Sequence, residues 1–318
     1  MKGRATDETA TGEAASASAS ASASASAPET ASTTKRGARS ARAETFEQAR
    51  ARLSWLERFN IGFIKATFAS RRIDRVLEWC LRNIGARWVH LGTRNIRVVE
   101  GVERARAAAQ ADGFLLMANH RSFFDMFVIQ MVLYRSGFRR RLLFPVRSTF
   151  FYDNPVGFVV NGLMSFFSMY PPVFRDRNRL TLNHTAYSEL VRALKGGRAA
   201  GIHPEGTRNK TDDPYTLLPP QAGIGRAIHQ TQLPVVPVFI NGLGNSLLGQ
   251  LVNNATRRGR RIIVVFGEPI DFRDLLSKPG NKQTYQQIAD RVMDAISSLG
   301  AEEKRIRSTL EGVESTGG

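Results

Sequence analysis

Cysteine and long apolar runs are scarce in this chain. Cys80 is the only cysteine among 318 residues. A single cysteine cannot form an intramolecular disulfide, and a cysteine-rich metal site is excluded. Residues 1–42 contain no apolar run of the roughly seven residues that a secretory signal requires. We therefore expect a protein of the reducing cytoplasm.

The sequence also lacks a segment that is suited to crossing a bilayer. A spanning helix needs about 20 largely apolar residues. The best uncharged run, residues 156–174, contains Asn161, two glycines and the pair Pro171-Pro172. We therefore expect peripheral attachment to a membrane, and a re-entrant segment stays open as an alternative.

Several common catalytic signatures are missing. The chain has no Gly-x4-Gly-Lys-Ser/Thr loop, no His-Glu-x-x-His pair and no Gly-x-Ser-x-Gly elbow. These absences exclude the usual nucleotide triphosphatases, zinc peptidases and esterases. Gly242 and Gly244 follow an apolar run and imitate a dinucleotide-binding loop, but Leu247 occupies the third glycine position. We therefore expect no dinucleotide cofactor.

Acidic residues are few relative to basic ones. The chain holds 45 Lys and Arg against 28 Asp and Glu, a net charge of +17. Residues 35–110 alone hold 17 basic side chains against 7 acidic ones. Nucleic acid and an anionic membrane both attract such clusters, the membrane by about 1 kcal/mol per basic side chain near its surface. Charge alone does not choose between these partners.

Large apolar side chains are nearly absent from the first forty residues. Residues 15–27 alternate Ser and Ala, and their flanks are rich in Thr, Glu, Gly and Pro. Burial of such residues cannot offset the entropy lost on ordering them. The composition predicts a disordered low-complexity tail over residues 1–43.

Apolar residues recur at a spacing of three and four over residues 44–92. This spacing is typical of two amphipathic helices, with a break near Ser70. Trp55 and Lys65 are candidate anchors at a membrane interface. We expect residues 44–92 to form an amphipathic helical hairpin that docks on a membrane; the alternative is that its apolar stripes only cover the catalytic core.

Short β-rich runs alternate with helical patterns from residue 95 onward. The alternation predicts an α/β fold: a mixed, mostly parallel sheet flanked by helices. We expect one catalytic domain over residues 93–303 and a flexible C-terminal tail over 304–318. The expected strands are 96–99, 114–118, 142–146, 173–174, 199–203, 235–240 and 262–266, and the clearest expected helices are 122–134, 180–195 and 283–299.

A polar turn follows the apolar run 114–118 and precedes a helix. Side chains placed at the carboxyl end of a strand line clefts in α/β proteins. On one continuous helix His120 and Asp125 would lie about 140° apart, so they meet only if His120 precedes the first helical turn. In that position Asp125 fixes the tautomer of His120, and the histidine acts as a general base.

A second polar cluster, residues 201–208, also follows an apolar run. Arg208 comes soon after a glycine that permits an unusual backbone turn, and its planar guanidinium suits phosphate oxygens. A third basic group spans residues 175–179. Alone, each of the three motifs is more often a structural turn or a solvated charge run than a functional site.

Taken together, these motifs resemble those of a known family. Residues 119–125 resemble the Asn-His-x-Ser-x-x-Asp signature of the glycerophospholipid acyltransferase family, and residues 204–208 resemble its Pro-Glu-Gly-Thr-Arg block. Residues 174–177 resemble its apolar-Asp-Arg block, and residues 233–238 resemble its later Val-Pro-Val strand. The resemblance extends over roughly residues 50 to 300.

The resemblance implies an acyltransferase that uses no metal or cofactor. His120 deprotonates the hydroxyl of a lysophospholipid acceptor, most simply 1-acyl-sn-glycerol-3-phosphate, and Asp125 orients the base. The acyl thioester donor is acyl-CoA or acyl carrier protein. The implied partner is an anionic membrane surface at the cytoplasmic face of the cell membrane, reached peripherally or monotopically, and not nucleic acid. The implied acceptor-binding residues are Arg177, Glu205, Gly206, Thr207 and Arg208.

The chain departs from the family pattern at two positions. His203 stands where an apolar aromatic residue is usual, and Gln221 stands where a Lys is common. His203 is either a second polar contact to the acceptor or a partly buried residue at a strand end. Arg175 is an alternative to Arg177 as the phosphate ligand, after a small shift of register.

Other functions stay open on the sequence. Another lysolipid or polar lipid could be the acceptor. Ser122 lies next to the motif histidine and could carry the acyl group covalently. A non-enzymatic basic protein that binds membranes or nucleic acid would use His120 and Asp125 only structurally.

Overall fold

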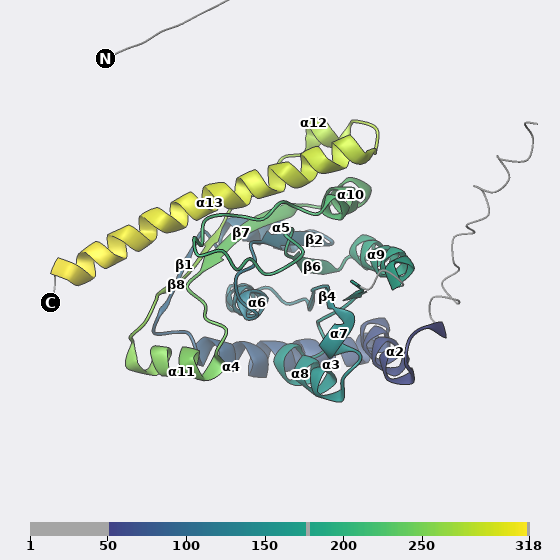
Figure 1. Cartoon of the computed structure of the whole chain (residues 1–318), viewed down its shortest axis with the longest axis horizontal. Helices are drawn as coiled ribbons and strands as arrows, with labels where there is room; N and C mark the ends of the chain where they lie inside the picture. The colour runs from purple at the N-terminus through teal and green to yellow at the C-terminus, as the bar shows by residue number, and fades with distance from the viewer. Residues whose placement is uncertain (1–50, 176–178, 317–318) are drawn as a thin grey trace, which may run out of the picture. The chain divides into compact units, whose positions relative to one another are not determined.

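The computed structural model describes residues 51–175 and 179–316, which belong to one compact unit. The tail expected over residues 1–43 and the start of the docking segment lie outside the described residues. The unit is an α/β fold with helices on both faces of a sheet (Figure 1), as the sequence predicts.

The main sheet has six strands in the order β1-β8-β7-β2-β6-β3. Neighbouring strands are parallel except β7 and β8, which are antiparallel, so the expectation of a mixed, mostly parallel sheet is confirmed. Its strands are β1 (Arg97–Glu100), β2 (Phe114–Ala118), β3 (Leu142–Leu143), β6 (Ala199–Ile202), β7 (Val235–Asn241) and β8 (Ile262–Phe266).

A separate pair of short parallel strands, β4 (Val146–Arg147) and β5 (Pro172–Val173), lies beside this sheet. The sequence predicts a single strand over 142–146, and this prediction is wrong. Pro145 lacks the N–H that a continuous ladder needs, so the chain leaves the main sheet after β3.

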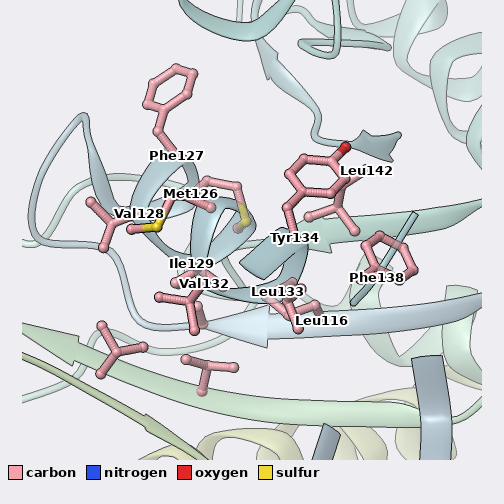
Figure 2. Close-up of a cluster of buried hydrophobic side chains, with 14 of the residues drawn as sticks. Leu116, Met126, Phe127, Val128, Ile129, Val132, Leu133, Tyr134, Phe138 and Leu142 are labelled. Atoms are coloured by element: carbon pink, nitrogen blue, oxygen red, sulfur yellow. The ribbon is translucent and has the colours of Figure 1, made fainter. Parts of the chain in front are cut away.

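Helices cover the two faces of the sheet. Alternate side chains of β2 point to opposite faces, Leu116 into the core with α6 and Leu115 into the core with α13. Figure 2 shows Leu116 beside Val132 and Leu133 of α6. The remaining helices of this layer system are α5 (Arg104–Gln110), α6 (Asp125–Arg135), α9 (Leu180–Lys195), α10 (Ala222–Thr231), α12 (Arg273–Leu276) and α13 (Lys282–Thr316).

Helix α13 is longer than the sequence pattern predicts. The expected helix over 283–299 continues to Thr316, so the expectation of a flexible tail from residue 304 is wrong for the described residues. Ile306 and Leu310 continue its packing against the core. Arg307 is buried and donates to Glu303 one turn earlier and to the carbonyl of Arg261 at 3.0 Å, which fixes this end of the helix.

The first described segment is helical and breaks at Ser70, as predicted. Ser54 and Glu57 form a reciprocal capping box at the start of α2 (Trp55–Ala69). Ser70 ends this helix and caps the next, so it serves both. The segment continues as α3 (Arg71–Cys80), a π-helical turn η2 (Leu81–Gly85) and α4 (Ala86–Leu91).

Three further helices belong to the side of the unit opposite α13. They are α7 (Ser148–Phe151), α8 (Pro155–Ser165) and α11 (Leu247–Thr256), which lie with α2, α3 and α4 along this side (Figure 1). None of the helices in residues 51–175 and 179–316 is both long and apolar enough to span a bilayer.

Candidate active site

The candidate site lies at the carboxyl end of β2. This strand ends at Ala118 and helix α6 begins at Asp125, so residues 119–124 form the turn between them. The side chain of Asn119 is buried, donates to the Ile240 carbonyl at 2.9 Å and accepts from the Ile240 N–H at 2.8 Å. Asn119 therefore extends the contact between β2 and β7 beyond the strand and holds the start of the turn.

His120 and Asp125 meet as the sequence requires. His120 precedes the helix, and its Nδ1 lies 3.2 Å from Asp125 Oδ2. The same oxygen accepts the backbone N–H groups of Arg121 and Ser122, each at 2.7 Å. Asp125 is the first residue of α6, where the helix dipole favours a negative charge. The predicted geometry of the pair is confirmed.

The hydrogen bonds define the protonation state of the pair. Asp125 Oδ2 accepts from two backbone N–H groups, which favours the carboxylate, so His120 Nδ1 is the donor in their contact. The Nε2 atom of His120 then carries a free lone pair. Burial, with added repulsion from Arg208 and Arg175, lowers the pKa of His120 to about 4. The imidazole is therefore neutral at pH 7 and able to take a proton.

Burial shifts the pKa of the Asp125 carboxyl group in the opposite direction. It raises the pKa of Asp125 to about 6, against the lowering effects of His203 and of the backbone N–H groups of Ser122 and Arg121. The acid is therefore mostly ionised at neutral pH. A carboxylate in this position stabilises the imidazolium that forms when His120 takes a proton.

Glu205 links the two motifs and is buried. It is only 2% exposed. One carboxylate oxygen accepts the backbone N–H of His120 at 2.8 Å, and the other accepts that of Leu218 at 2.9 Å. The predicted contact of Glu205 with the acceptor stays a prediction, and the two backbone bonds favour a different role because they occupy both oxygens. Through these bonds Glu205 positions the turn that carries His120.

The rest of the second motif is exposed. Gly206 has φ +67°, a backbone conformation that favours glycine, and it is followed by exposed Thr207 and Arg208. Arg208 donates to the side chain of Asn245 at 3.1 Å, and Arg175 donates to the Gly206 carbonyl at 2.7 Å. Three of the predicted acceptor-binding residues are thus accessible beside His120.

Arg177, the preferred phosphate ligand on the sequence, lies outside the described residues. The alternative, Arg175, is described, and its hydrogen bond to Gly206 places it next to the second motif. Asn245 was not singled out on the sequence. It accepts from both Arg208 and the backbone of Phe123, so it ties the two motifs together at 3.1 and 3.2 Å. Only the fold reveals such a contact, since 122 residues separate Asn245 from Phe123.

His203 stacks on the general-base candidate. The rings of His120 and His203 are nearly parallel, at an interplanar angle of 7° and a centroid separation of 3.9 Å. His203 follows β6, is half-buried and has its Nδ1 2.9 Å from the Ala118 carbonyl. Of the two roles considered on the sequence, the structure gives it that of a partly buried residue at a strand end. Burial, with repulsion from His120, lowers the pKa of His203 to about 3.

His120, Asp125 and His203 are close enough to suggest a metal site, but their orientation does not suit one. One ligand atom from each lies within 4.8 Å of the others. Zinc binds imidazole nitrogen in the ring plane at about 2.0 Å. Two rings stacked face to face at 3.9 Å cannot both direct a lone pair at one ion. The cluster therefore suits proton transfer better than metal binding.

Ser122 is not placed as a nucleophile. It is fully buried, and its hydroxyl donates to the Gly244 carbonyl at 2.8 Å. The same oxygen accepts the backbone N–H of Phe124 at 3.2 Å. These bonds close the loop at Gly244 over the start of α6, which argues against a covalent acyl-serine intermediate.

Part of the chain matches a known protein family. A family model described as Acyltransferase matches residues 96–241, a span that contains both motifs and ends with the last residue of β7. Together with the two motifs that it contains, this match supports the glycerophospholipid acyltransferase family and an O-acyltransferase activity.

The chain also has a solved structural relative. A crystal structure of the 1-acyl-sn-glycerophosphate (LPA) acyltransferase PlsC from Thermotoga maritima is similar to this chain, with 21% identity and a TM-score of 0.48. The match covers 78% of this chain and 90% of that one. No curated protein matches the sequence.

Proposed function

We propose that this acyltransferase moves a fatty acyl group from an acyl thioester to the hydroxyl of a lysophospholipid. The first choice of acceptor is 1-acyl-sn-glycerol-3-phosphate, which would give phosphatidic acid for phospholipid biosynthesis. The observation that carries the proposal is the 3.2 Å contact between His120 Nδ1 and Asp125 Oδ2, which leaves His120 Nε2 as a free base.

The proposed reaction is a direct transfer. His120 Nε2 takes the proton of the acceptor hydroxyl as its oxygen attacks the thioester carbonyl. The tetrahedral intermediate then collapses, the carbon–sulfur bond breaks, and the leaving thiolate takes the proton from His120. Asp125 stabilises the imidazolium between these steps. Such a base contributes about 10²- to 10⁴-fold, and the positioning of both substrates contributes the larger share.

Cationic side chains beside His120 favour an acceptor that bears a phosphate. Arg208 and Arg175 are close enough to His120 to lower its pKa, and guanidinium groups bind phosphate oxygens in a bidentate manner. Thr207 is exposed between Gly206 and Arg208 and can add a hydroxyl contact. Another lysophospholipid shares this phosphate and is the alternative acceptor.

The donor and the location are also part of the proposal. The donor is acyl-CoA or acylated acyl carrier protein, and the proposed chemistry involves no metal or cofactor. The enzyme works at the cytoplasmic face of the cell membrane, held peripherally or monotopically by residues 44–92. Of the described part of that segment, Trp55 is 73% exposed, and Phe59 and Trp79 are also exposed, as interface anchors are.

A substrate panel tests the proposed function. Purified full-length protein is incubated with several lysophospholipids, each paired with acyl-CoA or acylated carrier protein, and the products are identified by mass. We expect one diacyl product together with one equivalent of free thiol. Release of free fatty acid without a diacyl product would point instead to a hydrolase. Absence of any turnover with all pairs would contradict the proposal.

A further inference from the structure

Helix α11 is oriented opposite to the usual surface helix. Its buried side chains are the polar residues Gln250 and Asn254, which are one turn apart. Its outward face carries Leu248, 73% exposed, and Val252, 51% exposed. A helix on the surface of a soluble domain normally turns its apolar stripe inward.

Hydrogen bonds fix this orientation. The side chain of Asn254 donates to the Leu91 carbonyl at 2.7 Å and accepts the N–H of Asn95 at 2.9 Å. Asn95 in turn donates to the Asn254 carbonyl at 2.9 Å. Rotation of α11 to bury its leucines would break these bonds and leave buried polar groups unpaired. The apolar face is therefore held outward by the fold.

Helix α8 has the same inverted pattern. Asn161 and Ser165 are fully buried and bond each other at 2.6 Å, whereas Val159 and Leu163 are exposed. Helices α8 and α11 lie with α2, α3 and α4 on the side of the unit opposite α13 (Figure 1). Exposed apolar faces of several helices on one side of a domain mark a side that contacts a partner or a membrane.

Basic residues border the apolar face of α11. Arg257 ends the helix, and Arg258 and Arg260 follow it in the loop to β8; all three are exposed. A second copy of this chain would bring like charges together, whereas an anionic lipid surface would bind them. The helix has 10 residues, so its length of about 15 Å is half of the hydrocarbon thickness. The helix can lie in the membrane interface but cannot span the bilayer.

We propose that α11 is a further membrane-docking element. Leu248 and Val252 enter the apolar boundary of an anionic bilayer, and Arg257, Arg258 and Arg260 bind lipid phosphates. This inference rests on the proposed membrane function, but it assigns a contact outside residues 44–92. The bilayer is thereby set next to the site, since α11 follows Asn245, which accepts a hydrogen bond from Arg208. The acceptor lipid can then meet His120 without leaving the bilayer surface.

A fluorescent probe tests the contact directly. In the full-length C80S/L248C variant, a nitrobenzoxadiazole group is attached at position 248, since Cys80 is the only native cysteine. The matched control, C80S/S297C, carries the probe at position 297 of α13, where Ser297 is exposed. With vesicles of phosphatidylcholine and phosphatidylglycerol, we expect a blue shift and higher intensity at position 248 only. Equal responses at both positions, or none at 248 while the protein is bound, would overturn the inference.

Flotation with the same vesicles separates this inference from the proposed function. We expect L248E/V252E to lower vesicle partition by at least about tenfold, because burial of each side chain favours binding by about that factor. The control S297E/A301E adds the same charge to α13 and should change little. Loss of binding on Phe59→Glu but not on L248E/V252E would overturn the role of α11 and leave docking by residues 44–92 intact.

Two further measurements test the proposal: vesicle binding of a variant without the three arginines, and the oligomeric state of the lipid-free protein. R257Q/R258Q/R260Q should weaken binding to anionic vesicles by about fivefold per arginine, with little change on neutral vesicles. Sizing of the lipid-free protein tests a second copy as the occupant. A dimer that L248E/V252E converts to a monomer would overturn the membrane assignment. Activity of the variants on detergent-dispersed lysolipid reports the acyltransferase function separately.

Discussion

The substitution Glu205→Gln tests whether this residue positions His120 or binds the acceptor. Glutamine has nearly the same shape and keeps one carbonyl oxygen. Its amide group would face one of the two backbone N–H groups, of His120 or Leu218, that the carboxylate now accepts at 2.8 and 2.9 Å. One hydrogen bond is thus lost, and two donors, the glutamine NH2 group and a backbone N–H, face each other in its place. The substitution therefore disturbs the turn that carries the base.

The magnitude follows from the bond that is lost. A hydrogen bond to a charged group contributes about 1.5–3 kcal/mol, so we expect the free energy of unfolding to fall by about this amount. For a domain of this size each kcal/mol lowers Tm by about 2–4 °C, which predicts a fall of about 3–12 °C. Displacement of His120 should lower kcat by about 10- to 100-fold, since small misplacements near a reacting atom have effects of this order.

Thermal unfolding and steady-state kinetics with the acceptor measure both effects. The positioning role predicts lower Tm and kcat, with KM for the lysolipid changed by less than about threefold. Arg208→Gln is the matched control, because Arg208 is exposed and accessible to the acceptor. A Glu205→Gln protein with unchanged Tm and kcat but a tenfold higher KM would refute the reasoning and restore the acceptor-binding role.

Other predictions address the base, its charge and its neighbours. Asp125→Asn should lower kcat by about 10²- to 10⁴-fold because the amide no longer fixes the required tautomer of His120; full activity would exclude the orienting role. The pKa of His120, lowered to about 4, and that of Asp125, raised to about 6, predict that kcat/KM is flat above about pH 7 and falls as the pH drops through 6, more steeply near pH 4. An acid limb centred above about pH 7 would contradict this. Ser122→Ala should destabilise the fold by about 1 kcal/mol through the lost bond to Gly244 yet retain transfer, whereas a covalent route predicts nearly complete loss. Arg208→Gln should raise KM for a phosphate-bearing acceptor, measured by initial rates, with kcat changed less; an unchanged KM would remove Arg208 from the acceptor site.

The strands were more predictable than the surface helices. β2 and β8 match their predicted bounds because continuous apolar runs are typical of strands buried on both faces of a sheet. Periodicity finds the apolar stripe of a helix but not the direction in which the stripe faces. The outward stripe of α11 depends on buried Asn254 finding a backbone partner, Leu91, that lies 163 residues away, which no local pattern encodes. That of α8 depends on buried Asn161 bonding the carbonyl of Met169 beyond the end of the helix.

The catalytic pair of the candidate site was predictable from the sequence, but the residues that hold the pair in place were not. The spacing of His120 and Asp125 required a turn before the helix, and the structure has that turn. The role of Glu205 could not be predicted, because its motif gives no sign that both carboxylate oxygens bind backbone N–H groups. The ring contact of His203 likewise depends on β6 lying next to β2 in the sheet.

A single-turnover assay of the wild-type protein and His120→Ala tests the central claim most directly. Each protein, in excess, is mixed with labelled acyl thioester and lysophosphatidic acid in detergent, and diacyl product and free thiol are followed by mass. We predict stoichiometric phosphatidic acid from the wild type, and from His120→Ala a rate lower by about 10²- to 10⁴-fold at nearly unchanged Tm. Transfer by His120→Ala at the wild-type rate would contradict the account.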